Sequence, residues 1–375
     1  MKLFVIAGEP SGDRLGGALM QGLKTLAPGV TFQGIGGPLM QSEGLDSLFP
    51  MEELSVMGLA EVLPKYPALK RRIRETAQAV LASGARAMIT IDSPDFCLRV
   101  AKIVKAGRPD LPTIHYVAPS VWAWRPGRAA KMARVIDHVL ALLPFEPPLM
   151  TAAGLSCDFV GHPVVSEPLA TPAERAMMDG SYPLILALPG SRRAEVTRLC
   201  PVLGQTLRLI KATCPNARVA LPTVRGVADL VRELTAGWPI VPEIITDPTR
   251  KRAAFAAADV AIAASGTVSL ELAANECPMV IAYDMHPITL WLMRRAALID
   301  TVTLVNLVSE TRTIPEFIGS RCRPDLIAPA VLDLLAEHGR SQKHAMGLTM
   351  ESLGLGGAAP GMRAARSVLV HLNKR

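Results

Sequence analysis

At 375 residues, the chain is long enough to favour two domains over one. Half of the residues are hydrophobic and only 4% are aromatic, which is typical of a globular protein with aliphatic cores. No apolar run is long enough for a transmembrane helix, and the six cysteines and seven histidines lack the spacing of a disulfide framework or a metal site. We therefore expect a reduced, cytosolic protein without metal or cofactor.

Short apolar runs alternate with helical patterns through the first half of the chain. Strands are predicted over residues 2–8, 31–37, 87–92, 113–119, 138–144 and 157–163, and helices over 12–26, 69–82, 96–107 and 128–135. Such an alternation is typical of βαβ units, in which the strands form a parallel sheet.

A stretch rich in proline and polar residues interrupts this pattern after Pro163, and the pattern restarts at Leu184. The predicted fold is α/β, with two Rossmann-like, doubly wound parallel-sheet domains over residues 1–165 and 166–345. The remaining residues, 346–375, read as a Gly-rich hinge and a helix from about Pro360. This helix either returns to the first domain or exchanges with a second copy in a homodimer. Strands of the second domain are expected over 184–191, 218–224, 243–246, 260–265 and 278–283.

The first strand ends in the turn Gly8-Glu9-Pro10-Ser11-Gly12-Asp13. Ligands of open α/β sheets bind beyond the carboxyl ends of the strands, so Ser11, Gly12 and Asp13 are candidate binding residues. The turn lacks the G-x-G-x-x-G pattern and a ribose-binding acid, which disfavours a nicotinamide dinucleotide. The structural alternative is a simple turn in which Ser11 or Asp13 caps the helix.

Two carboxylates follow the strand over residues 87–92, in the segment Asp92-Ser93-Pro94-Asp95-Phe96. A carboxylate at this edge of the sheet is a candidate general base. Asp95 is better placed to cap a helix beginning near Phe96, so Asp92 is the preferred base. The alternative is that both acids only cap the helix or form the turn.

The segment HYVAPSVWAWRPGR holds two of the four tryptophans beside arginines. Trp122 and Arg125 on a predicted loop suit a sugar or a lipid phosphate. A tryptophan pair packed between domains is the alternative.

In the second domain, the predicted strand from Leu184 breaks at the turn Gly190-Ser191 and is followed by Arg192 and Arg193. Backbone N–H groups at the start of a helix, together with a guanidinium, can bind a diphosphate without a metal. Each charge-assisted contact contributes roughly 1.5–3 kcal/mol, so several could hold a nucleotide.

A second turn of this kind, Ser265-Gly266-Thr267, follows the strand that begins at Val260. Glu271, one turn into the next helix, could accept hydrogen bonds from ribose hydroxyls. No P-loop or G-x-S-x-G motif occurs, which disfavours ATP hydrolysis and the usual hydrolase elbow. The two turns predict a site for a nucleoside diphosphate sugar, and a carboxylate base in the first domain would complete a glycosyl transfer site.

The motifs GEPSGD, IDSPDF, HYVAPSVWAWR, FVGHP, LPGSR, ASGT and VNL, in this order, resemble those of the bacterial lipid A disaccharide synthases. The resemblance covers nearly the whole chain. It implies a GT-B glycosyltransferase that joins UDP-2,3-diacylglucosamine to 2,3-diacylglucosamine 1-phosphate (lipid X) with inversion. The products would be UDP and the β-1,6 disaccharide of lipid A biosynthesis.

The resemblance also implies roles for individual residues. Asp92 corresponds to the family's proposed base, Arg192 to its diphosphate ligand and Asn306 to an asparagine near the donor. Met57 lies in an apolar stretch expected to receive acyl chains. Cys97 departs from the family pattern, which has asparagine at this position. Residues expected in the nucleotide turn are Ser265, Gly266, Thr267 and Glu271, and those in the acceptor crevice are Ser11, Gly12 and Asp13.

The resemblance further implies a protein that is peripheral to the cytoplasmic face of the inner membrane. The stretch from Pro64 to Arg74, PKYPALKRRIR, mixes cations with apolar residues and fits an anionic membrane surface, although a solvated helix face is the alternative.

Two other functions would each explain part of the sequence. A UDP-N-acetylglucosamine 2-epimerase-like enzyme would share the fold and the nucleotide site, but it needs no acyl-binding surface. A nucleic-acid-binding protein would explain the net charge of +7, but aromatics are scarce and no recognised binding motif occurs. No nucleic acid partner is therefore expected.

Overall fold

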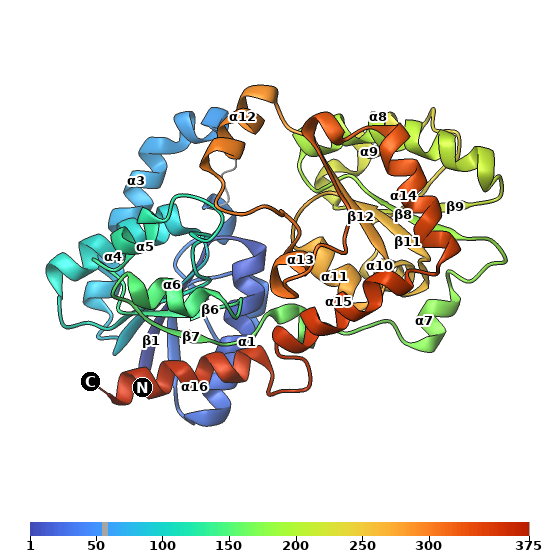
Figure 1. The fold of residues 1–375 in the computed structure, drawn as a ribbon. Helices are drawn as coiled ribbons and strands as arrows, with labels where there is room; N and C mark the ends of the chain where they lie inside the picture. The colour runs from blue at the N-terminus through green and yellow to red at the C-terminus, as the bar shows by residue number, and fades with distance from the viewer. Residues whose placement is uncertain (55–58, 375) are drawn as a thin grey trace. The chain divides into compact units, whose positions relative to one another are not determined.

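The computed structural model describes residues 1–54 and 59–374. By its internal contacts the chain divides into two units, one formed by residues 1–166 together with 356–375, the other by residues 167–355. Each unit has its own parallel sheet, flanked by helices (Figure 1). The predicted α/β class with two parallel sheets is therefore confirmed.

In the described part of the first unit the sheet has the order β3-β2-β1-β4-β5-β6-β7, and its strand pairs are parallel. The order reverses at β1 and β4, so the chain leaves these neighbouring strands in opposite directions. Both strand ends meet at this switch point, where ligands of doubly wound sheets bind. The strands are β1 (Lys2–Ala7), β2 (Thr31–Ile35), β3 (Asp46–Ser47), β4 (Ala87–Ile91), β5 (Thr113–Tyr116), β6 (His138–Ala141) and β7 (Ser156–Phe159).

The helices of this unit pack the sheet on both faces, because a parallel sheet has two apolar sides to bury. α1 packs against α2 and α16, and α3 packs against α4. α3 begins at Leu59, ten residues before the predicted start at residue 69. The helices are α1 (Pro10–Leu26), α2 (Pro38–Ser42), α3 (Leu59–Ala82), α4 (Pro94–Gly107), α5 (Gly127–Met132), α6 (Glu146–Ala152) and α16 (Pro360–Asn373).

The C-terminal helix α16 begins at Pro360, as predicted, and lies beside α1 of the same chain (Figure 1). Two glycines make the close approach possible. A Cβ on Gly361 would lie 2.6 Å from the carbonyl oxygen of Ala18, and one on Gly22 would lie 2.8 Å from the carbonyl oxygen of Gly361. The backbones of the two helices therefore touch where neither has a side chain.

Gly361→Ala should destabilise the protein by about 1–3 kcal/mol, since backbone must shift to admit the methyl group. Gly347→Ala is the matched control, because Gly347 is also helical and a Cβ there meets open space. The control should be neutral or stabilising by up to about 1 kcal/mol through helix propensity. Urea unfolding of both variants measures the difference; equal stabilities would contradict the close α1–α16 contact.

The sheet of the second unit has the order β10-β9-β8-β11-β12-β13 in the described residues, again with parallel pairs. β3 of the first unit and β13 of the second were not predicted, since both are too short to show a pattern. The strands are β8 (Leu184–Leu188), β9 (Arg218–Pro222), β10 (Glu243–Ile245), β11 (Val260–Ala263), β12 (Met279–Tyr283) and β13 (Glu316–Ile318).

Residues 346–352, predicted as part of a hinge, instead complete α15, whose inner face packs against α11 and α13. The helices of this unit are α7 (Pro172–Ala176), α8 (Arg193–Thr213), α9 (Ala228–Thr235), α10 (Pro248–Ala257), α11 (Val268–Ala274), α12 (Pro287–Ala296), α13 (Leu304–Val308), α14 (Pro324–Ala336) and α15 (Arg340–Ser352).

Three buried histidines make the stability of the first unit sensitive to acid. Burial lowers the pKa of His115, His138 and His162 from 6.5 to about 4. Nδ1 of His162 accepts the backbone N–H of Val164 at 3.2 Å, and a proton there would break this hydrogen bond. Below pH 6.5 the unfolded chain binds protons that the folded chain does not, so protonation favours unfolding.

The free energy of unfolding should therefore fall by several kcal/mol between pH 6.5 and 4. Burial also raises the pKa of Glu146 to about 7, which acts in the opposite direction between pH 7 and 4.5. Because three histidines oppose this one carboxyl, the net change is a loss of stability. Urea titrations over this pH range measure it, and a constant or rising stability would contradict the neutral, buried histidines.

Candidate functional site

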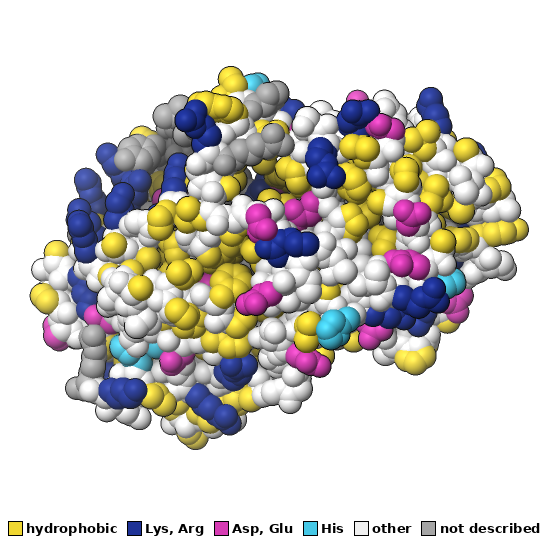
Figure 2. Space-filling model, in the orientation of Figure 1, with side chains coloured by type: hydrophobic (Ala, Val, Ile, Leu, Met, Phe, Trp, Pro, Cys, Tyr) yellow, Lys and Arg dark blue, Asp and Glu magenta, His cyan; other side chains and the backbone are white. Residues whose placement is uncertain are grey.

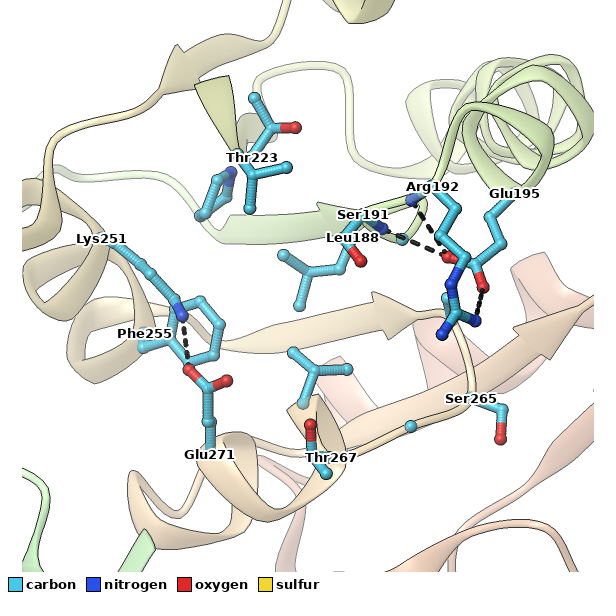
Figure 3. A pocket seen from close by; sticks show the side chains of 16 residues that line it. Leu188, Ser191, Arg192, Glu195, Thr223, Lys251, Phe255, Ser265, Thr267 and Glu271 are labelled. Carbon is cyan, nitrogen blue, oxygen red and sulfur yellow. Dashed lines mark hydrogen bonds and ion pairs between the residues drawn. The ribbon is translucent and has the colours of Figure 1, made fainter. Parts of the chain in front are cut away.

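One pocket of the second unit, with a volume of about 470 Å³, lies at the carboxyl ends of β8, β9 and β11 (Figure 3). Turns after these strands form its walls, because neighbouring parallel strands end at the same edge of a sheet. Seven residues predicted for nucleotide binding line it: Gly190, Ser191, Arg192, Ser265, Gly266, Thr267 and Glu271. The other lining residues are Leu188, Glu195, Pro222, Thr223, Val224, Lys251, Phe255, Ala264 and Val268.

The turn after β8 takes its shape from Gly190, whose φ of +102° is a conformation that other residues rarely adopt. Arg192 then precedes the first residue of α8, and its side chain is 64% exposed. Glu195 folds back over the turn, and its Oε2 accepts the backbone N–H groups of Ser191 and Arg192 at 3.2 and 3.3 Å. The sequence predicted that these two amides would donate to a bound anion. In the structure they are already hydrogen-bonded to Glu195.

The turn after β11 is the opposite wall of the pocket (Figure 3). Gly266 has a φ of +152°, and α11 begins directly after Thr267. Glu271 lies in the first turn of this helix and forms an ion pair with Lys251, with Nζ and Oε2 2.5 Å apart. Among the residues that the structure describes, none donates to its other carboxylate oxygen, which can accept a hydrogen bond from a ligand.

Asn306 does not line this pocket. It is 1% exposed, and its amide nitrogen donates to the carbonyl of Ile314 at 3.0 Å while its oxygen accepts the N–H of the same residue. These bonds hold the end of α13 against the segment that leads into β13. The polar atoms of Asn306 are thus bonded inside the unit, and the pocket lining does not bring it together with the other residues predicted at the donor.

In the first unit, Asp92 follows β4 directly and has a φ of +53°, a left-handed conformation that Ser93 shares. Such strain in non-glycine residues occurs most often at functional sites. The hydroxyl of Ser11, which follows β1, donates to Oδ2 of Asp92 at 3.3 Å. Two predicted site residues, 81 positions apart, thus meet at the switch point of the sheet.

Asp95 does not cap the helix, contrary to expectation. The N-cap of α4 is Ser93, and Asp95 is an exposed residue of the first turn. Helix α4 begins at Pro94, not near Phe96, since proline suits the first helical position. Asp92 remains the carboxylate nearer the switch point.

Gly12 and Asp13 are buried within α1 rather than presented to solvent. Asp13 is 3% exposed, and its carboxylate accepts the backbone N–H groups of Gly37, Leu39 and Met40 at 2.9–3.0 Å. It therefore caps α2, not its own helix, and is not available to line a crevice. Of the three residues predicted in this turn, only Ser11 is exposed.

The indole N–H of Trp122 is hydrogen-bonded inside the unit, where Nε1 donates to Oε1 of Glu146 at 3.1 Å. Its ring packs edge-on against Phe145, with 5.4 Å between ring centroids. Arg125 is exposed and stacks over Trp124, with the guanidinium carbon 4.1 Å from the ring centroid. Of the two predicted residues, Arg125 is the one whose polar group faces outward.

Cys97 is fully buried beneath the Asp92 turn. Burial, and to a lesser degree the charge of Asp92, raises the pKa of its thiol, so the group stays neutral. Met57 lies outside the described residues. Among the residues that the structure describes, no group of acidic, histidine or cysteine side chains could hold a metal ion, and no helix is long and apolar enough to cross a membrane.

Sequence reasoning missed three polar residues of the pocket: Thr223, Lys251 and Glu195. Thr223 directly follows β9, and Lys251 belongs to α10. No sequence motif marks either residue. Glu195 could have been found, because a glutamate three residues into a helix is the usual partner of the helix N-cap.

Two parallel-sheet units in one chain, one of them with two phosphate-type turns, are typical of nucleotide-sugar enzymes of the GT-B fold. A family model described as lipid-A-disaccharide synthetase matches residues 3–356. The chain belongs to this family, whose members are glycosyltransferases of lipid A biosynthesis.

Curated relatives agree with this assignment. The lipid-A-disaccharide synthase of Ruegeria pomeroyi is 60% identical, with 99% of this chain and 96% of the relative aligned. That of Rhodospirillum centenum is 47% identical, with 100% and 95% aligned.

Solved structures share the fold at low identity. The UDP-GlcNAc 2-epimerase of Neisseria meningitidis, bound to UDP-GlcNAc, has a TM-score of 0.69 and 10% identity, with both chains fully covered. MurG of Acinetobacter baumannii has a TM-score of 0.54 and 14% identity over 100% and 99% of the chains. At such identities these structures are evidence for the fold alone. The family membership favours neither the epimerase nor the nucleic-acid alternative.

Proposed function

We propose that this enzyme transfers the diacylglucosamine unit of UDP-2,3-diacylglucosamine to the 6-hydroxyl of lipid X, with inversion, and releases UDP. The observation that carries the proposal is one pocket that seven of the eight residues predicted for nucleotide binding line, all but Asn306. Two turns that carry hydroxyls and a guanidinium suit a diphosphate, and the Glu271 carboxylate suits a ribose.

Arg192 would offset the negative charge that develops on the leaving UDP. Its side chain is exposed at the rim of the pocket and can reach a ligand (Figure 3). A guanidinium supplies this charge without a metal ion, because it stays protonated and offers several donors in one plane.

Asp92 would act as the general base that removes the proton of the acceptor hydroxyl. Its position at the switch point of the first sheet and its strained backbone support this role. The hydrogen bond from Ser11 fixes one carboxylate oxygen and leaves the other for the acceptor.

Helix α3 supports a peripheral position on the cytoplasmic face of an anionic inner membrane. Lys70, Arg71 and Arg74 lie together along this helix, and Arg72 beside them forms ion pairs with Glu53 and Glu75. Figure 2 shows Lys and Arg side chains gathered over this part of the first unit. Such a cluster attracts anionic lipids with about 1 kcal/mol per cation.

The test is the release of UDP from UDP-2,3-diacylglucosamine, with and without lipid X, in detergent and without added metal. Release that depends on lipid X, together with a disaccharide product seen by mass spectrometry, would establish the reaction. Release without the acceptor would indicate hydrolysis or epimerase-like chemistry and would contradict the proposal. UDP binding without release would keep the nucleotide site and reject these substrates.

A further inference from the structure

Glu195 is the most heavily bonded side chain of the pocket. Its Oε2 accepts the N–H groups of Ser191 and Arg192, and its Oε1 accepts the guanidinium Nη1 of Arg192 at 3.1 Å. The hydroxyl of Tyr283, at the end of β12, also donates to Oε1 at 3.4 Å. One carboxylate therefore joins the turn after β8, the first turn of α8 and the end of a second strand.

The fit around this carboxylate is close. A Cβ on Gly190 would lie 2.5 Å from Oε2 of Glu195, so the turn and the carboxylate occupy adjoining space. The Glu195 side chain is only 14% exposed, whereas that of Arg192 is 64% exposed. A nearly buried carboxylate that accepts from four donors thus holds the guanidinium of an exposed arginine (Figure 3).

We propose that Glu195 is a positioning residue for the donor diphosphate and that it acts through Arg192. An arginine free in solvent loses up to about 2 kcal/mol of side-chain entropy when a ligand fixes it. The ion pair with Glu195 restricts the guanidinium before the ligand arrives, which lowers this cost on binding. Because Nη1 faces Glu195, the remaining guanidinium donors stay available for phosphate oxygens.

The proposal rests on the proposed function, since it takes the diphosphate of UDP as the ligand. The same geometry allows an opposite effect, in which the carboxylate repels the diphosphate and occupies amides that the ligand needs. We favour positioning, because Arg192, a donor of the pocket, is itself bonded to Glu195 and would be free without it. Positioning predicts that replacing Glu195 weakens UDP binding, whereas repulsion predicts that it strengthens UDP binding.

The experiment is a double-mutant cycle on UDP binding, measured by calorimetry with Glu195→Ala, Arg192→Ala and the double variant. Glu195→Ala should weaken UDP binding about tenfold, and Glu195→Gln, which keeps a capping oxygen, by about threefold. In the Arg192→Ala background, Glu195→Ala should cause little further loss. In transfer assays Glu195→Gln should raise the KM for the donor and leave the KM for the acceptor unchanged.

Asp229→Ala is the matched control. It removes an acid–arginine pair of the same three-residue spacing, Asp229 with Arg232, on helix α9 away from the pocket lining. The control should leave UDP affinity unchanged, and thermal unfolding of every variant separates loss of binding from loss of fold.

Three results would overturn the inference. Tighter UDP binding by Glu195→Gln would show repulsion in place of positioning. If the loss of UDP affinity in the double variant equals the product of the two single losses, Glu195 does not act through Arg192. Unchanged binding by Glu195→Ala would show that it has no role. If the wild-type protein fails to bind UDP, the proposed function itself is wrong and this inference falls with it.

Discussion

Replacing Asp92 by alanine should lower the rate of transfer by about 10²–10⁴-fold, the usual contribution of a general base. UDP affinity should stay within about twofold, because the carboxylate lies in the first unit and the residues that line the nucleotide pocket belong to the second. The acceptor hydroxyl has a pKa far above neutrality, so its attack depends on a group that takes its proton. We therefore expect a loss in kcat with donor binding retained.

Initial rates of lipid X-dependent UDP release, together with UDP calorimetry, measure both quantities. Asp95→Ala is the matched control, since Asp95 is an exposed carboxylate of the adjoining helical turn. Its rate should remain near that of the wild type. If Asp92→Ala turns over normally, the assignment is wrong, and Asp95 and Glu9 become the next candidates.

Replacing Arg192 by alanine should weaken UDP binding by roughly 10- to 100-fold, since a hydrogen bond to a charged group contributes about 1.5–3 kcal/mol. The rate should fall as well, because the same guanidinium would stabilise charge on the departing diphosphate. A higher KM for the donor together with a lower kcat would distinguish Arg192 from Asp92.

Arg193→Ala provides the comparison, because Arg193 is the exposed neighbour in the sequence but does not line the pocket. Its UDP affinity should be close to that of the wild type. Equal losses for both arginines would mean that only the overall positive charge matters, and not the position that the Gly190 turn sets.

Much of the pocket in the second unit could be predicted from sequence, because its turns are local. Gly190 and Gly266 each break an apolar strand, and the residues that face the ligand lie within a few positions of them. Short-range backbone geometry decides such turns, and parallel strands then bring the two turns to the same edge of the sheet. Composition and periodicity similarly indicated the α/β class.

Other predicted site residues lie elsewhere than expected, because partners far along the chain decide where their side chains point. Asp13 and Asn306 look like ligand-binding residues in their motifs, yet one caps α2 and the other holds the segment before β13. Both form backbone hydrogen bonds inside the protein, as buried polar groups must. No local pattern distinguishes such a residue from one that faces a ligand.

The amino-acid sequence by itself determined the alternation of strands and helices, the two phosphate-type turns and the family to which the chain belongs. Only the tertiary structure decided that Ser11 meets Asp92, that α16 lies against α1 and that Glu195 holds Arg192. The reason is physical. Turn conformation and apolar periodicity depend on neighbouring residues, whereas the burial and the hydrogen-bond partners of a polar side chain depend on how distant segments pack.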